Sequence, residues 1–88
     1  MPITQEALAN WFTYHAPANH PLGEAEAVRR YHDIREGGRV LAELIVECTP
    51  ASADQTAAVR LVREAVMTAN AALACMTEEQ AAALELEG

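Results

Sequence analysis

The feature that most constrains the fold is a pair of long segments in which apolar or small residues recur at alternating intervals of three and four positions. The segments run from about Glu24 to Cys48 and from about Ala53 to Met76, and this spacing places the repeated residues along one side of an α-helix. Such a side packs lengthwise against a neighbouring helix. The residues are Tyr31, Ile34, Gly38, Leu41, Ile45 and Cys48 in the first segment, and Val59, Val62, Val66, Ala69, Leu73 and Met76 in the second.

A short link separates the two segments. Pro50 predicts the end of the first helix, because the residue before a proline is disfavoured in a helical conformation. Ser52, with Gln55 three residues later, is typical of a capping box that starts the second helix. Two long amphipathic helices joined in this way predict an antiparallel helical hairpin and an all-α fold.

Both ends of the chain predict short additional helices. Thr4 is expected to cap a helix that continues to about Trp11. Thr77 and Gln80 form a second capping box, which starts a short acidic helix at the C-terminal end. Residues 16–23 contain two prolines and a glycine, so they predict a loop.

A hairpin of two helices cannot enclose a core alone, because each helix has only one covered side. The second segment also carries another stripe of mostly small residues, which allows a further helix to approach closely. We therefore expect one helical hairpin domain over residues 1–88 that assembles as a homo-oligomer. The alternative is a monomer whose N-terminal segment covers the stripe. The stripe comprises Ala58, Leu61, Ala65, Thr68, Ala72 and Cys75.

The charge is distributed unevenly along the chain. Thirteen acidic and six basic residues give a formal net charge of −7, which disfavours DNA or RNA bound along an open surface. All the basic residues are arginines between positions 29 and 63, so an anionic ligand is expected in the central part. Arginine can hold phosphate with two parallel hydrogen bonds. The alternative is that most of these arginines lie on solvated helix faces and pair with glutamates. They are Arg29, Arg30, Arg35, Arg39, Arg60 and Arg63.

Two glycines interrupt the first helical segment. Gly37 and Gly38 each cost on the order of 1 kcal/mol relative to alanine in a helix. This cost is expected to be offset by a close approach, either of a neighbouring helix or of a ligand. Arg35 and Arg39 flank the glycines on one face of the helix, four residues apart.

Aromatic residues gather near the N-terminus, where Trp11, Phe12 and Tyr14 precede His15. Aromatic rings stack on nucleic-acid bases with about 1–3 kcal/mol per base, whereas arginines hold phosphates. Tyr14 and His15 are therefore expected to point toward a pocket. The alternative is a hydrophobic anchor that holds the N-terminal segment against the hairpin.

The sequence contains no phosphate-binding glycine loop, GxSxG motif or HExxH motif, so we expect a binding protein rather than an enzyme. His15 and His20 lie close in sequence but lack the companion ligands of a zinc site, so no metal and no cofactor are expected. Cys48 and Cys75 fall on apolar stripes and are predicted to be small core residues. The chain has neither a signal-peptide pattern nor an apolar run of roughly 18 residues, which predicts a cytosolic protein away from membranes.

Four motifs, taken in order, resemble one protein family. They are F-T-Y-H-A-P from Phe12, R-Y-H-D-I-R from Arg30, C-T-P-A-S from Cys48, and E-A-V-M-T-A-N-A-A-L-A from Glu64. Together they are similar to the hairpin domain of phage anti-defence sponge proteins, which sequester cyclic nucleotide signals made by CBASS and Thoeris bacterial immunity. The resemblance covers residues 12–74, and its most specific elements are Y-H-x-P and A-V-M-x-A-N.

The resemblance implies a phage protein that acts in the cytoplasm of the infected bacterial host. It implies binding of cyclic dinucleotides, without cleavage, in pockets between the protomers of a homohexamer. Because no segment is strand-like, the chain is similar to the shorter anti-CBASS branch. By motif position, Tyr14 would stack on a base and Arg35 would meet the phosphates. The ligand-binding candidates are Phe12, Tyr14, His15, Arg30, Arg35, Arg39 and Asn70.

The chain departs from the family pattern at three places. The link over residues 18–29 is longer and could reshape the mouth of the pocket, Thr68 replaces a tryptophan, and Cys75-Met76 replace a position that is often basic. The last two departures bear on a second site for cyclic trinucleotides that some members carry, so cyclic dinucleotides are the primary expected ligands. The alternatives are a sponge for the cyclic ADP-ribose type signals of Thoeris and an oligomeric helical interaction module without a small ligand.

Overall fold

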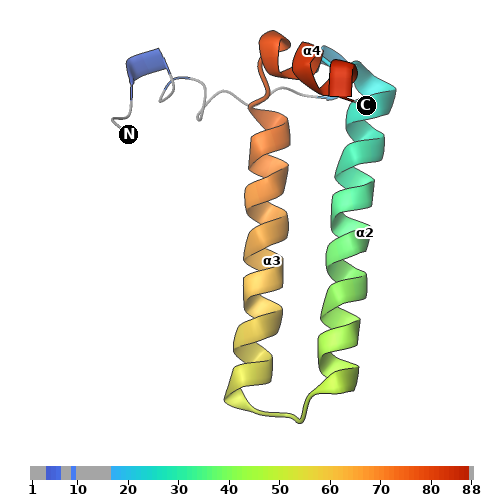
Figure 1. Ribbon diagram of the computed structural model, residues 1–88, viewed down its shortest axis with the longest axis vertical. Helices are drawn as coiled ribbons and strands as arrows, with labels where there is room; N and C mark the ends of the chain where they lie inside the picture. Colours follow the sequence, from blue (N-terminus) through green and yellow to red (C-terminus); the bar gives the residue numbers. More distant parts are fainter. Residues whose placement is uncertain (1–3, 7–8, 10–16, 88) are drawn as a thin grey trace.

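The computed structural model describes residues 4–6, 9 and 17–87. Two long helices, α2 (Glu24–Cys48) and α3 (Ala53–Ala74), run antiparallel and side by side (Figure 1). The short helix α4 (Glu78–Glu87) lies across the end of the pair where α2 begins and α3 ends (Figure 1). The described residues contain no strand, so the predicted all-α helical hairpin is confirmed.

The N-terminal part precedes α2 and is described only in pieces. Gln5, Glu6 and Ala9 are helical, and the rest of the helix predicted there lies outside the described residues. In the loop predicted over residues 16–23, Pro17–Asn19 form the 3₁₀ turn η1.

The bounds of α2 match the predicted segment. Gly23 precedes the helix with a φ angle of 91°, a conformation that glycine adopts without the strain that a Cβ atom would cause. Its carbonyl accepts the N–H of Ala27 at 3.0 Å, which closes the first turn. At the other end Thr49 is extended, as expected for the residue before Pro50, and the helix ends at Cys48.

The predicted capping box at the start of α3 is only half formed. Ser52 Oγ accepts the N–H of Gln55 at 3.2 Å, which satisfies one of the unpaired amides of the first turn. The Gln55 side chain does not return to Ser52. Its Nε2 donates to the carbonyls of Val46 at 3.3 Å and Thr49 at 3.0 Å. Gln55 therefore ties the start of α3 to the end of α2, because those carbonyls face it across the link.

Helix α3 ends at Ala74, two residues earlier than predicted. The N–H of Met76 bonds to the carbonyl of Leu73 at 3.3 Å, which tightens the last turn. Thr77 then caps α4, as its Oγ1 accepts the N–H of Gln80 at 3.1 Å and its own N–H donates to Gln80 Oε1 at 3.0 Å. This second capping box is confirmed. Because a capping residue is not helical, the chain must leave α3 before Thr77.

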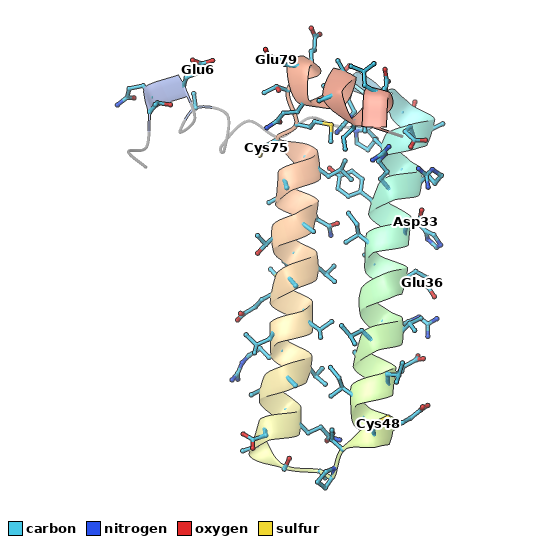
Figure 2. The ribbon with its side chains drawn as sticks, viewed as in Figure 1. Glu6, Asp33, Glu36, Cys48, Cys75 and Glu79 are labelled. Atoms are coloured by element: carbon cyan, nitrogen blue, oxygen red, sulfur yellow. The ribbon has the colours of Figure 1, made fainter. Side chains whose placement is uncertain are left out.

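The buried core lies where α4 crosses the hairpin. Leu73, Met76 and Ala81 form its centre, and four partly buried residues pack against it. Cys75 is buried there, as predicted, whereas Cys48 is exposed at the opposite end of the hairpin (Figure 2). The prediction of Cys48 as a core residue is wrong, because none of the described elements covers the end at which α2 and α3 are joined. The four packed residues are Leu22, Tyr31, Ile34 and Leu84.

Away from α4 the hairpin is a single layer of two helices. Leu41, a member of the predicted seam, is 51 % exposed, because α3 covers only one side of α2. No described helix combines the length and the apolarity that crossing a membrane requires. The other large apolar side chains exposed on the two helices are Val28, Val40, Leu44, Val46, Leu61 and Met67.

Candidate functional site

The predicted ligand-binding residues divide into two groups. Phe12, Tyr14 and His15 lie outside the described residues. The other four, Arg30, Arg35 and Arg39 on α2 and Asn70 on α3, are described.

Gly38 marks the side of α2 that faces α3. A Cβ atom added at Gly38 would lie 2.3 Å from Cγ2 of Val66 and 3.8 Å from Cγ1 of Val62, so the two helices meet closely here. The helix-approach explanation therefore accounts for Gly38. An added Cβ at Gly37 would meet nothing within 4 Å, and Gly37 lines an apolar groove of about 440 Å³ beside Leu41 and Leu61.

The helical turn of about 3.6 residues distributes the arginines of α2 over two sides of the hairpin. Arg35 and Arg39 lie on one side, where they line a hollow of about 220 Å³ together with Arg63 of α3. We call this the arginine hollow. The rest of its lining consists of small or apolar residues, namely Gly38, Ala42, Val59, Val62 and Val66.

Arg30 lies in a different place. It lines a groove of about 600 Å³ that runs between α2, α3 and α4, and the arginine hollow does not include it. The structure thus brings Arg35 and Arg39 together and separates Arg30 from them. The groove, which we call the α4 groove, is lined by Arg29, Arg30, Asp33, Ile34, Ala69, Ala72, Leu73, Met76, Gln80 and Leu84.

Both arginines of the α4 groove are paired with carboxylates of their own helix. Arg30 Nε donates to Glu26 Oε1 at 2.8 Å, and Arg29 Nη1 lies 2.7 Å from Asp33 Oδ2. Hydrogen bonds from Arg29 and Arg30 lower the pKa of Glu26 from 4.5 to about 2. The alternative prediction of solvated arginines paired with carboxylates is therefore correct for Arg29, which is exposed, whereas Arg30 is paired but only partly exposed.

In the arginine hollow, the three arginines differ in their partners. Arg39 binds Glu36, with 3.0 Å between Nε and Oε1, and also binds Glu43. The hydrogen bond from Arg39 lowers the pKa of Glu36, and the same bond raises the pKa of Arg39. Arg35 and Arg63 are exposed, and neither forms an ion pair within the described part of the chain. Their guanidinium groups are thus available to an anion.

Asn70 follows Arg63 by two helical turns on the same side of α3. Asn70 is half-buried, and its Oδ1 atom is buried without a hydrogen-bond partner among the described residues. A buried acceptor without a donor is unfavourable by about 1–3 kcal/mol. Asn70 can therefore gain stability from any N–H group that reaches it.

Two residues with structural importance were missed by the sequence predictions. His20 is buried, with Nε2 2.7 Å from the carbonyl oxygen of Leu73 and Nδ1 accepting the N–H of Leu22 at 3.0 Å. It anchors the long 18–29 link to the end of α3, a contact over 53 positions that no local pattern shows. Arg63 was not selected, although its spacing of three residues before Val66 places it next to the seam.

The described part of the chain is therefore an antiparallel helical hairpin with an arginine-lined hollow, an apolar groove beside Gly37, and the α4 groove at the end where α4 crosses it. It belongs to the family described as Acb2/Tad1, hairpin domain, whose sequence profile matches residues 4–74. This is the family of anti-CBASS and anti-Thoeris sponges, which bind cyclic nucleotide signals and sequester them. The match ends at the last residue of α3, so α4 lies outside it.

The predicted family resemblance is thus confirmed. The comparison with curated proteins and the comparison with solved structures each gave no significant match.

Proposed function

We propose that this protein binds cyclic dinucleotides made by CBASS immunity and holds them intact, so that the signal does not reach its effector. The observation that carries the proposal is the state of Arg35, the position at which the family motif implies a phosphate contact. Arg35 is exposed in the arginine hollow and has no carboxylate partner among the residues that the structure describes, whereas Arg30 and Arg39 are ion-paired. A phosphodiester can reach its guanidinium without displacing a glutamate.

The base would be recognised by residues other than the arginines. Tyr14 is proposed to stack on a base, with Phe12 and His15 beside it in the same segment. The Oδ1 atom of Asn70, which has no hydrogen-bond partner within the described part of the chain, offers an acceptor for an amino group or ring N–H of a base. An aromatic face combined with a cation and an amide acceptor is a set of groups that suits a nucleotide.

The proposal includes assembly of several copies, as a homohexamer of single-domain chains with pockets between protomers. The support is the apolar surface that two helices leave uncovered. Leu41 and Leu44 on α2 and Leu61 on α3 are each at least half exposed. Packing of a second copy against these side chains would remove them from water. The proposed place of action is the cytoplasm of an infected bacterial host, where the signals are made.

Isothermal titration calorimetry with a ligand panel tests the function. The panel contains cyclic dinucleotides, cyclic trinucleotides and cyclic ADP-ribose type compounds, each at micromolar concentration. We expect binding of a cyclic dinucleotide, and recovery of the intact ligand after denaturation. Binding of the ADP-ribose type compounds alone would assign the protein to Thoeris signals. No heat with any compound would instead indicate an interaction module without a small ligand.

Two substitutions locate the site. Loss of the stacking ring in Tyr14→Ala is expected to weaken binding about 5- to 150-fold, from about 1–3 kcal/mol per stacked base. Loss of the charged hydrogen bonds in Arg35→Ala is expected to weaken it about 10- to 150-fold. Arg60→Ala is the matched control, because Arg60 is an exposed arginine that does not line the arginine hollow. Unchanged affinity in both Tyr14→Ala and Arg35→Ala would place the site elsewhere.

A further inference from the structure

We propose that Arg63, on α3, is a second phosphate-binding residue of the site that contains Arg35. This inference rests on the function proposed above and names a contact that the motif resemblance does not include. It follows from the position of Arg63 in the arginine hollow, from its lack of an ion-pair partner among the described residues, and from the charge of the expected ligand.

The register of the two helices brings Arg63 near Arg35. Gly38 lies against both Val62 and Val66, so it is level with the point on α3 midway between these two residues. Because the helices are antiparallel, Arg35, three residues before Gly38, is level with a point on α3 about three residues after the one that Gly38 faces. Arg63 precedes that point on α3 by about four residues. At 1.5 Å per residue, the two arginines are separated by roughly 6 Å along the helix axes. Both line the same hollow.

The charges in the hollow favour an anion at these two arginines. Glu36 and Glu43 bind Arg39 and leave Arg35 and Arg63 without a carboxylate partner in the part of the chain that the structure describes. A bound anion would neutralise the positive charge that Arg35 and Arg63 bring to one hollow. A cyclic dinucleotide carries two phosphodiester groups and thus two negative charges, which matches in number the two guanidinium groups of Arg35 and Arg63.

The surroundings of the hollow also suit a phosphate contact. Its lining between the arginines is small and apolar, with Gly38, Ala42 and Val66 contributing no side-chain hydrogen-bond donors or acceptors. A phosphate in the hollow would therefore take its donors from the guanidinium groups that line it. Arginine donates from a planar fork, so each of the two residues can form two parallel hydrogen bonds to phosphate oxygens.

The test compares Arg63→Gln with Arg60→Gln, which removes an arginine one turn earlier on the same helix and outside the hollow. Calorimetry uses the cyclic dinucleotide of the panel that binds the unsubstituted protein most tightly, at low and at high salt. We expect Arg63→Gln to weaken binding about tenfold or more and to make it less sensitive to salt. Arg60→Gln should change affinity by less than about twofold, since exposed charges outside a contact contribute little. Arg63→Lys, which keeps the charge without the planar fork, should restore part of the affinity.

Circular dichroism and light scattering complete the test, because Arg63 is exposed and its replacement should leave helicity and assembly mass unchanged. Equal affinities of Arg63→Gln and Arg60→Gln would overturn this inference and leave the proposed function standing. A change in assembly mass specific to Arg63→Gln would assign the residue to an interface between copies and would also overturn it. No binding of any cyclic dinucleotide by the unsubstituted protein would overturn both proposals.

Discussion

Alanine at Gly38 should destabilise the hairpin, whereas alanine at the neighbouring Gly37 should stabilise it. Both substitutions remove a glycine from the interior of α2, so each gains about 0.5–1 kcal/mol of helix stability. Only Gly38 faces α3. Its new Cβ atom would lie 2.3 Å from Cγ2 of Val66, against an ordinary contact distance of 3.4–4 Å. At Gly37 an added Cβ meets nothing within 4 Å.

The difference between the two variants isolates the steric cost, because the gain in helix propensity is common to both. Val66 must move by about 1 Å, and its β-branched side chain has essentially one favoured rotamer in a helix. Overpacking of this kind costs about 1–3 kcal/mol. The free energy of unfolding of Gly38→Ala should therefore lie about 1–3 kcal/mol below that of Gly37→Ala. For a domain of this size, 1 kcal/mol corresponds to about 4–8 °C in Tm.

Thermal unfolding followed by circular dichroism measures this difference. All variants must be compared at one protomer concentration, because assembly makes Tm depend on concentration. Light scattering should confirm equal assembly masses, since Gly37 lines an apolar groove. In the double variant Gly38→Ala, Val66→Ala the clashing methyl group is gone, so the combined loss should be smaller than the sum of the two single losses. Equal Tm values for Gly37→Ala and Gly38→Ala would refute the close approach of α2 and α3.

Three further predictions concern the helix ends and the first turns of α2. Ser52→Ala removes the oxygen that accepts the Gln55 N–H, so the free energy of unfolding should fall by about 1 kcal/mol, measurable by urea denaturation; no loss would contradict the role of the cap. His20→Ala removes the buried contact with Leu73, and a fall of about 1–3 kcal/mol is expected, with faster hydrogen exchange in the 18–29 link as the specific readout. The pKa of Glu26 is lowered from 4.5 to about 2, so its carboxylate stabilises the fold above about pH 4.5 and loses that contribution as the pH falls toward 2. The Tm of Glu26→Gln should decline less over this window, and an equal decline would count against the ion pairs.

Much of the local structure could be predicted from the sequence. The three-and-four spacing and Pro50 predicted the bounds of α2, and Thr77 with Gln80 predicted the start of α4. These features depend on residues within one or two turns of each other, so the periodicity of the helix is enough to predict them. The motifs that resemble the sponge family are also short runs of consecutive residues, and the family match over residues 4–74 bears out the resemblance.

The ion pairs within α2 were a further local feature. Arg29 and Arg30 with Glu26, and Arg39 with Glu36, are three or four residues apart, where side chains on a helix meet. The sequence allowed this pairing as an alternative to ligand binding. It did not decide between them, because an arginine can turn to a glutamate of its own helix or to a neighbouring segment.

The tertiary structure decided which residues from different helices share a side. The contact of Gly38 with Val66 sets the register, and that register brings Arg63 of α3 into one hollow with Arg35 of α2 while Arg30 turns to another groove. The tertiary structure also placed His20 against Leu73 and left Cys48 outside the core. Helical periodicity determines the direction in which a side chain points around the axis of its own helix. Which residue it meets depends on the relative position of two helices, and contacts between residues far apart in the chain determine that position.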